Sequence, residues 1–354
     1  MATIKDVAAL AQVSVATVSR VLNQSGYADA DTRARVLEAA EQLGYKTNIH
    51  WSRLKSKSSK TILFLLSNHS QFNTFHTRIL GVCERLLRAR GYDLIFTRSE
   101  YASDLRGNEI PLPNMLNHEG ACDGVLLAGI HHPNLISVLK KRQIPYALLG
   151  NNFEGFAGPP ETNCVYFDDV SAMEESTHYL IRLRHERIAF IGNTSLPWFR
   201  NRHAGYLRAI EASQLTPMEV TENWSISNID YGSLAVSQLL RSPLHPTAIL
   251  AGNDEIAAGC WKELTKRKIQ IPNSMSLIGI GDRLEFSILE PALSSISVFP
   301  EQLGERLTLM LLEQIRNPRR SMPSEMLPCK LIERASCAPP QEEFKIHTLK
   351  RKAP

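Results

Sequence analysis

A short stretch near the start of the chain, residues 3–23 (TIKDVAALAQVSVATVSRVLN), combines residue types that could read DNA bases. Val15, Ala16 and Arg20 share the outward side of a helix that is predicted to begin after Ser14. Small side chains in a first turn let a helix enter the major groove, where Val15 and Ala16 would contact thymine methyl groups. Arg20 would pair with guanine O6 and N7. An ordinary N-terminal helical hairpin is the alternative.

Hydroxyl and amide side chains surround these three residues. They suit contacts with DNA phosphates or the capping of helix ends, and the sequence leaves both roles open. The set is Thr3, Ser14, Thr17, Ser19 and Asn23.

Two short helices are predicted to hold this face in place. The first spans about residues 4–11, with Thr3 as its N-cap and Asp6 three residues later, close to a capping box. Its apolar stripe is Ile4, Val7, Ala8, Leu10 and Ala11, and the second helix buries Val18, Val21 and Leu22.

A third helix is predicted from Asp29 or Asp31 to Leu43, and Gly44 would end it in the left-handed conformation. Its apolar stripe is Val36, Ala39, Ala40 and Leu43, while Arg33 and Arg35 point outward. Three short helices form only a thin core, so we expect this unit to need a partner, either DNA or a second subunit.

The net positive charge of the chain is concentrated at its N-terminal end. Residues 1–60 hold nine Lys or Arg and five Asp or Glu, whereas the remainder holds 31 of each. In the stretch HWSRLKSKSSK, every charged side chain is a Lys or an Arg, and no Asp or Glu occurs. This asymmetry favours binding of a polyanion by the N-terminal sixth, although a solvated linker would have a similar composition.

Composition and motifs exclude several classes of protein. The 354 residues include no apolar run of about 18 residues and no N-terminal signal pattern, so we expect a cytoplasmic protein without a membrane span. The six scattered cysteines are expected to be reduced. We find no P-loop, G-x-S-x-G or metal-ligand spacing, the GIGD sequence lacks a third glycine, and His131-His132 suits a loop. No catalytic residue, metal or cofactor is therefore expected.

From Thr61 onward, short apolar strands alternate with helices. The strands are KTILFLLS, YDLIFTRS, CDGVLLAGI, IPYALLGN, RIAFIGN, TAILAGND and SLIGIG. The helices are ILGVCERLLRARG, LISVLKKRQ, SAMEESTHYLIRLR, SLAVSQLLRS and IAAGCWKELTKRK. Such alternation predicts parallel sheets covered on both faces, and about 280 residues exceed one comfortable core. We therefore expect an α/β body of two doubly wound lobes.

The string MATIKDVAALAQVSVATVSRVLN…TRARVLEAAEQLGY resembles the helix-turn-helix headpiece of the LacI–GalR family of bacterial transcription regulators, from Met1 to Leu54. The body is more loosely similar to the effector domain of that family, which is related to periplasmic sugar-binding proteins. The pieces that match are RGYDL, CDGVLLAG, RHERIAFIGN, RHAGYLRAIE, ILAGNDEIAAG, SLIGIGD and EPALSSI. The resemblance implies a homodimer on a near-palindromic double-stranded DNA operator, controlled by a small-molecule effector between the lobes.

Candidate effector ligands follow from the rule that open α/β sheets bind ligands beyond the carboxyl ends of their strands. They are Asn73, Phe75, His76, Asn151, Asn253, Asp254 and Asp282. The resemblance adds Arg202, which matches the effector-binding arginine of the family. Trp198 could stack on a sugar or be an ordinary loop residue, and Asp254 could instead cap the helix that follows it. Gly150 and Gly281 stand where the family often has polar residues, so the effector class stays open between a sugar and a related metabolite.

The segment between headpiece and body departs from the family pattern. Asn48 and Leu54 are kept, and the resemblance gives Leu54 the role of a wedge in the minor groove. Thr47 replaces a proline, and Trp51 replaces a small residue that faces the partner hinge.

The sequence therefore predicts four segments: a headpiece (1–46), a hinge (47–60), a two-lobed effector-binding and dimerisation domain (61–340) and a disordered tail (341–354). The expected function is that of a sequence-specific transcriptional regulator, a repressor. The alternative is a cytosolic enzyme of sugar or nucleotide metabolism on the same body.

We expect Trp51 to force two paired hinge helices apart or to alter their register, and so to change the bend of the bound DNA or the spacing of its half-sites. Bend angles measured by gel mobility on one operator should differ between the wild type and Trp51→Ala. Equal bends for the two proteins would contradict this.

Overall fold

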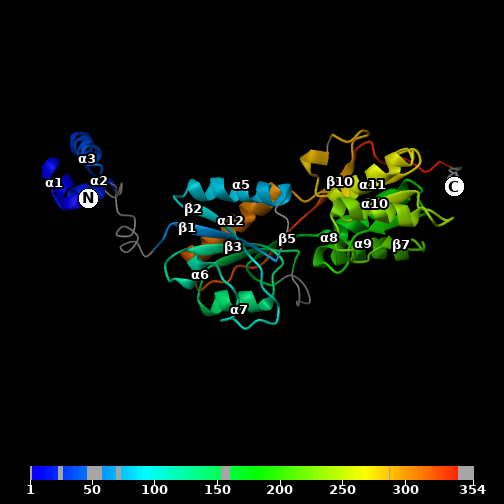
Figure 1. Ribbon diagram of the computed structural model, residues 1–354, viewed down its shortest axis with the longest axis horizontal. Helices are drawn as coiled ribbons and strands as arrows, with labels where there is room; N and C mark the ends of the chain where they lie inside the picture. Colours follow the sequence, from blue (N-terminus) through cyan, green and yellow to red (C-terminus); the bar gives the residue numbers. More distant parts are fainter. Residues whose placement is uncertain are drawn as a thin grey trace, which may run out of the picture. The chain divides into compact units, whose positions relative to one another are not determined.

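The computed structural model describes residues 2–22, 27–45, 58–68, 73–152, 160–286 and 288–341. Its contacts form two compact units: Met1–Thr61 with His118–Asp123, and Ile62–Asn117 with Gly124–Pro354 (Figure 1). Within the described residues, no helix is long and apolar enough to cross a membrane.

The first unit contains the three predicted helices, α1 (Ile4–Leu10), α2 (Val15–Leu22) and α3 (Ala30–Gln42). The residues predicted to cap the starts of these helices make the expected hydrogen bonds. The backbone N–H of Thr3 donates to Asp6 Oδ2 at 2.7 Å, and Ser14 Oγ accepts from the backbone N–H of Thr17 at 3.1 Å. Asp29, rather than Asp31, caps α3, and Gly44 follows that helix with a φ of +58°. Local capping thus fixes all three helices.

Small apolar side chains form the core of this unit. The buried set is Val7, Ala8, Ala11, Val18, Val21, Val36, Ala39 and Ala40. Two leucines that we expected in the core are exposed instead, Leu10 by 48% and Leu43 by 37%. The alanines and valines already fill the narrow space between the helices, which leaves Leu10 and Leu43 at its edge.

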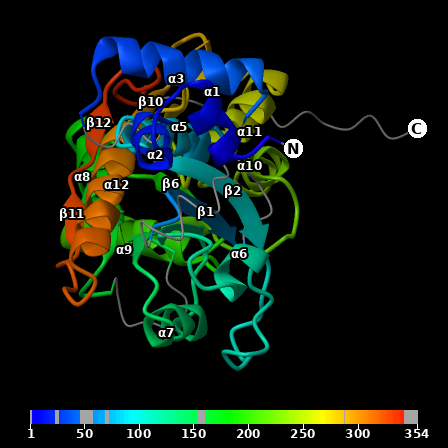
Figure 2. The same cartoon turned by 90° about the vertical axis from the view of Figure 1, so that its left-hand side faces the viewer.

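Lobe 1 of the second unit is built on a six-stranded sheet in the order β11-β5-β4-β3-β1-β2. The strands are β1 (Thr61–Ser67), β2 (Asp93–Ser99), β3 (Gly124–Gly129), β4 (Tyr146–Leu149), β5 (Cys164–Phe167) and β11 (Glu325–Leu327). Helices α5 (Thr74–Arg88) and α12 (Pro300–Arg316) pack together on one face, with α6 (Asn114–Asn117) and α7 (Pro133–Lys141) on the other (Figures 1 and 2).

Lobe 2 contains the sheet β12-β10-β9-β8-β6-β7. Its strands are β6 (Ile188–Ile191), β7 (Met218–Val220), β8 (Ala248–Ala251), β9 (Ser276–Ile280), β10 (Ser294–Ser297) and β12 (Lys330–Ile332), the last antiparallel to β10. Helices α8 (Asp169–Arg182) and α9 (Pro197–Ala212) pack as one pair, and α10 (Asn228–Leu239) and α11 (Asp254–Lys266) as another. A short 3₁₀ helix, η1 (Leu284–Phe286), follows β9.

The alternation of side chains along β6 explains why both faces of this sheet are covered. Ile188 and Phe190 belong to the core that includes Tyr206 of α9, whereas Ala189 and Ile191 belong to the core that includes α10 and α11. The prediction of two doubly wound lobes is therefore confirmed. The chain passes between the lobes three times, after β5, after β10 and after β11.

A buried histidine connects the segment that follows β12 to the rest of lobe 2. His185 Nε2 lies 2.9 Å from the carbonyl oxygen of Ala338, so this nitrogen carries the proton and donates. Nδ1 lies 2.9 Å from the Thr247 hydroxyl, from which it accepts. Burial lowers the pKa of His185 to about 4.

We expect acid to destabilise the body through His185. Its pKa is about 4 in the folded protein and 6.5 for an ordinary imidazole, so the unfolded chain binds the proton more tightly. The contribution of neutral His185 to the free energy of unfolding is complete above pH 6.5. It is lost as the pH falls toward 4, and the loss is about 3 kcal/mol at most. Urea unfolding at several pH values should show a shallower loss between pH 6.5 and 4 in His185→Gln than in the wild type. An identical pH dependence of the two proteins would show that His185 does not carry this effect.

Candidate functional site

The exposed face of α2 carries the predicted base-contacting residues. Val15 is 41% exposed, and Ala16 and Arg20 are also exposed, whereas Val18 and Val21 face the core. Arg20 lies one helical turn after Ala16, and its Nε contacts the Ala16 carbonyl oxygen at 3.4 Å. Two small side chains and a guanidinium thus share one solvent-facing side of a short helix.

The hydroxyl groups around this face already act as caps. Thr3 Oγ1 donates to Asp6 Oδ2 at 2.8 Å, and the hydroxyls of Ser14 and Thr17 lie 2.9 Å apart. Hydrogen bonds from Thr3 lower the pKa of Asp6, which keeps its carboxylate charged at the positive end of α1. Of the two roles that the sequence left open, capping is present for Thr3 and Ser14, whereas the Thr17 hydroxyl contacts the Ser14 hydroxyl. Ser19 is half-buried on α2.

Several expected residues lie outside the described part of the chain. They are Asn23, Thr47, Asn48, Trp51 and Leu54.

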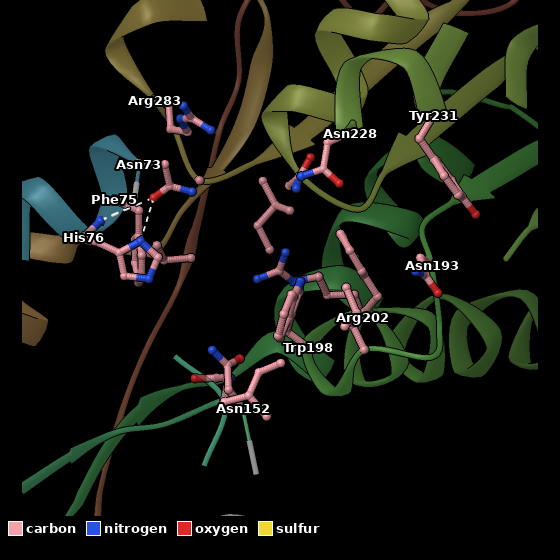
Figure 3. Close-up of a pocket in the computed structure, with 18 of the residues that line it drawn as sticks. Asn73, Phe75, His76, Asn152, Asn193, Trp198, Arg202, Asn228, Tyr231 and Arg283 are labelled. Atoms are coloured by element: carbon pink, nitrogen blue, oxygen red, sulfur yellow. Dashed lines mark hydrogen bonds between the residues drawn. The ribbon is translucent and has the colours of Figure 1, made fainter. Parts of the chain in front are cut away.

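A cavity of about 310 Å³ lies between the two lobes (Figure 3). Lobe 1 supplies Asn73, Phe75 and His76 from the start of α5, which face Trp198, Arg202 and Asn228 of lobe 2 across the cavity. The predicted residues that line it are Asn73, Phe75, His76, Asn151, Arg202 and Asn253, together with Trp198. The carboxyl ends of parallel strands bring these distant segments together, as the topology rule requires.

Arg202 is anchored at the base of the cavity by a buried ion pair. Its Nε donates to Asp169 Oδ1 at 2.9 Å, and Nη1 donates to the carbonyl oxygen of Gly252 at 2.6 Å. Asn151 Nδ2 donates to Asp169 Oδ2 at 2.7 Å. Burial raises the pKa of Asp169 above its ordinary value, while the Arg202 guanidinium acts in the opposite direction. Asn151 therefore positions the carboxylate that in turn holds Arg202.

Two expected effector ligands, Asp254 and Asp282, lie outside the lining, which corrects our sequence interpretation. Asp254 is fully buried, accepts from Ser295 Oγ at 2.6 Å and from the backbone N–H of Arg283 at 2.8 Å, and has its pKa raised to about 6 by burial. Asp282 accepts from Arg334 Nη2 at 2.6 Å. Gly281, with a φ of +130°, turns the chain at the end of β9 and directs the next residues away from the position that a straight strand would give. Asn253, not Asp254, caps α11.

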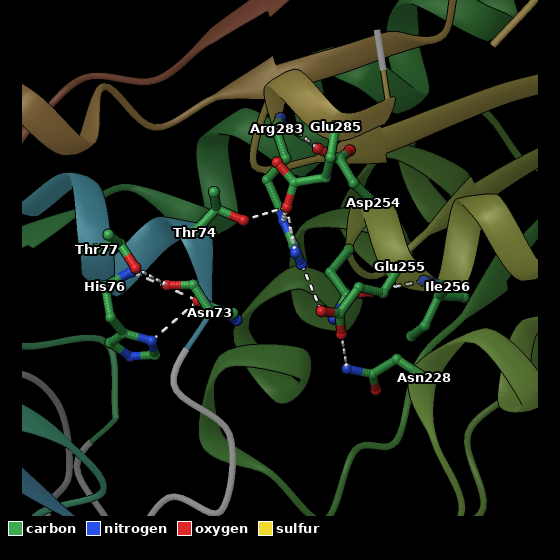
Figure 4. Close-up of polar contacts among 11 residues, drawn as sticks. Asn73, Thr74, His76, Thr77, Asn228, Asp254, Glu255, Ile256, Arg283 and Glu285 are labelled. Carbon is green, nitrogen blue, oxygen red and sulfur yellow. Dashed lines mark hydrogen bonds and ion pairs between the residues drawn. The ribbon is translucent and has the colours of Figure 1, made fainter. Parts of the chain in front are cut away.

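The sequence did not identify a polar network beside the cavity (Figure 4). Arg283 Nη1 donates to Glu255 Oε1 at 2.5 Å, and Arg283 Nε donates to Glu285 Oε1 at 2.7 Å. Glu285 also accepts a hydrogen bond from Thr74 of lobe 1, and Glu255 Oε2 accepts from Asn228 Nδ2 at 2.6 Å. Arg283 and Asn228 line the cavity but come from a loop and from the start of α10, where no periodicity signals them.

The remaining lining residues are mostly amides and apolar groups. They include Asn68, Ile130, Leu149, Asn152, Phe167, Asn193, Leu196, Phe199, Asn223, Ser225, Ile226, Tyr231, Ile280, Gly281 and Val298. Across the described ranges, no three His, Cys, Asp or Glu side chains are grouped in a way that could hold a metal ion.

We expect Arg202→Met to destabilise the body by about 3–5 kcal/mol, because it leaves the Asp169 carboxylate buried without its cation. Adding Asp169→Asn should recover part of this loss, since the uncharged amide tolerates burial better. A double-mutant cycle from urea unfolding measures the coupling. Additive effects of the two changes would contradict an interaction between the side chains.

Comparisons with known proteins agree with this architecture. Residues 3–48 match the family model described as bacterial regulatory proteins, lacI family, and residues 177–337 match a periplasmic binding protein-like domain. The HTH-type transcriptional repressor CytR of Escherichia coli (strain K12) is 28% identical over 340 residues, which cover 95% of this chain and 96% of that protein. The ribose operon repressor of the same strain is 30% identical over 342 residues, which cover 95% of this chain and all of the repressor.

The fold is shared with a solved structure of the Lac repressor dimer bound to operator and the anti-inducer ONPF. The TM-score is 0.80 at 23% sequence identity, over 95% of this chain and 99% of that one. Three capped helices, two doubly wound lobes and similarity to family members along nearly the whole chain lead to one conclusion: the chain belongs to the LacI family of bacterial regulatory proteins.

Proposed function

We propose that the chain is a sequence-specific DNA-binding regulator of transcription, a repressor, whose affinity for its operator is controlled by a small molecule in the interlobe cavity. The observation that carries this proposal is the combination, in one chain, of a helical unit with an exposed α2 face and a body with a ligand-sized cavity. The similarity to two repressors over 95% of the chain supports it. Family membership also favours a regulator over the metabolic enzyme that was the alternative.

DNA recognition is assigned to α2 and its surroundings. Val15 and Ala16 contact thymine methyl groups, and Arg20 donates to a guanine. Phosphate contacts come from residues near both helix ends, and the wedge in the minor groove comes from the hinge. The phosphate contacts are assigned to Thr3, Ser14, Thr17, Ser19 and Asn23, and the wedge is Leu54.

The effector is bound by Asn73, Phe75, His76, Arg202 and Asn253, and Asn151 lines the cavity beside them. Asn151 acts through Asp169, because both ends of its amide are already hydrogen-bonded. The name of the ribose operon repressor supports a sugar or a related metabolite as the effector class.

The regulator works as a homodimer in the cytoplasm, where its DNA is found. A two-fold dimer places two copies of α2 on a near-palindromic operator. The segments remain those proposed from the sequence: headpiece 1–46, hinge 47–60, two-lobed domain 61–340 and tail 341–354.

We expect Arg20→Ala to weaken binding to an operator selected from a random DNA library by about 1–3 kcal/mol and to relax the preference at one base pair. Arg33→Ala, a change to another exposed arginine, is the control. It should weaken binding to all sequences alike or leave it unchanged. Fluorescence anisotropy with operators altered at single positions distinguishes the two variants. An equal loss of affinity on every sequence for Arg20→Ala would show that Arg20 contacts a phosphate and not a base.

A further inference from the structure

We infer that Asp123 is a positioning residue for DNA binding, because its carboxylate anchors the C-terminal end of the hinge beside the start of the lobe 1 sheet. This inference rests on the proposed function and adds a residue that fixes where the hinge leaves the body. It is carried by four hydrogen bonds to one side chain and by the backbone conformation that they hold.

Both oxygens of the Asp123 carboxylate accept hydrogen bonds from the end of the hinge. Oδ1 accepts from the backbone N–H of Ser59 at 2.6 Å and from the Ser59 hydroxyl at 2.8 Å. Oδ2 accepts from the backbone N–H of Lys60 at 3.2 Å and from the Ser58 hydroxyl. A carboxylate offers about four acceptor positions, so these donors fill them. Hydrogen bonds to a charged acceptor are also stronger than those between neutral groups.

Backbone hydrogen bonds complete the anchor. The N–H of Asp123 donates to the carbonyl oxygen of Thr61 at 2.8 Å, and the N–H of Thr61 donates to the Ser59 hydroxyl oxygen at 3.2 Å. Ser59 and Thr61 are only 2% and 3% exposed, so water has little access to these groups. The end of the hinge and the first residue of β1 are thus joined through Asp123.

The backbone of Lys60 shows that the anchor imposes a direction on the chain. Its φ is +54°, in the left-handed region that residues other than glycine rarely adopt. Such a conformation persists where the surrounding structure holds it, and here Asp123 Oδ2 holds the N–H of Lys60. The chain therefore turns in a fixed way as it passes from the hinge into β1.

The alternative is that Asp123 only stabilises the edge of the lobe 1 sheet. The parallel ladder between β1 and β3 begins one residue further along each strand, where Ile62 is paired with Gly124. The side chain of Asp123 instead bonds to residues 58–60, which precede β1. Its contacts are therefore those of a hinge anchor and lie outside the ladder.

A hinge end that is already ordered favours DNA binding, because its order does not have to be created when DNA binds. Ordering the backbone of one further residue on binding would lower the affinity by about 5-fold to 30-fold. Preorganisation removes this cost. Since Asp123 leads directly into β3 and Thr61 begins β1, the end of the hinge also has to follow any movement of these strands.

The first test compares DNA binding by the full-chain wild type, Asp123→Asn and Glu119→Gln in fluorescence anisotropy. Asparagine keeps the shape of the side chain, but its amide nitrogen cannot accept, so two of the four hydrogen bonds are lost. We expect Asp123→Asn to bind a selected operator about tenfold more weakly, and a duplex of unrelated sequence within twofold of the wild type. Glu119→Gln removes the same charge from an exposed residue of the same loop and should change neither affinity.

Two results of this test would overturn the inference. Unchanged operator affinity in Asp123→Asn would show that the anchor does not position the hinge. An equal loss on both duplexes would show a general loss of active protein. Should Asp123→Asn fail to fold, Ser58→Ala decides: it keeps the carboxylate, removes one donor and should weaken operator binding by a smaller factor, and unchanged affinity would again overturn the inference.

The second test measures the anchor without DNA, by hydrogen exchange resolved to single backbone amides. The amides of Ser59 and Lys60 should exchange at least tenfold faster in Asp123→Asn than in the wild type, while those of β3 keep their protection. Unchanged exchange at Ser59 and Lys60, or an equal loss of protection throughout β3, would overturn the anchor.

The two tests separate this inference from the proposed function. The exchange measurement contains no DNA, so its outcome does not depend on a regulatory role. Failure of the wild type to bind any selected operator would refute the proposed function, and with it the positioning role, even where exchange shows the anchor. An operator that the wild type binds, with no difference for Asp123→Asn, would refute the positioning role alone.

Discussion

The ion pair between Arg202 and Asp169 is the interaction on which the arrangement of the cleft depends. Asp169 begins α8 directly after the first crossing between lobes, and Arg202 lies one turn into α9. Both side chains are nearly fully buried, so each must find partners within the protein. Asn151 from the end of β4 and the carbonyl of Gly252 from the end of β8 complete the set. The pair thus connects strand ends of both lobes at the base of the cavity.

This arrangement explains why the cavity is polar and yet nearly free of net charge. Each arginine that lines the cavity is paired with a carboxylate. The lining amides are oriented by hydrogen bonds that their oxygens accept from backbone N–H groups. The network through Arg283 adds a link from lobe 2 to Thr74 at the start of α5 in lobe 1. A molecule that fills the cavity therefore contacts groups that also hold the two lobes together, which is a physical route from ligand binding to a change between lobes.

The sequence predicted the elements well because their signals are local. Thr3, Ser14 and Asp29 begin helices by capping, and the strands that the sequence predicted are found as β1–β4, β6, β8 and β9. The strands β5, β7, β10, β11 and β12 were not predicted. The carboxyl-end rule also found Asn73, Asn151 and Asn253. It failed for Asp282, because the direction of a side chain after a strand depends on the turn that follows, here set by Gly281. It also failed for Asp254, whose carboxylate is buried at the start of α11 by hydrogen bonds from Ser295 and Arg283. Arg283 and Asn228 could not be predicted, since Glu255, the partner that they share, lies 28 residues from Arg283 and 27 residues from Asn228. Their roles exist only once the chain has folded.

Occupation of the cavity should change the affinity of the protein for DNA. This expectation is tested most directly by fluorescence anisotropy of the full chain on a selected near-palindromic operator, with and without a saturating concentration of a sugar that calorimetry has shown to bind. We expect the dissociation constant to change by about 5-fold to 150-fold, the range that corresponds to typical coupling free energies between two sites. An identical dissociation constant in the presence and absence of the bound sugar would contradict it.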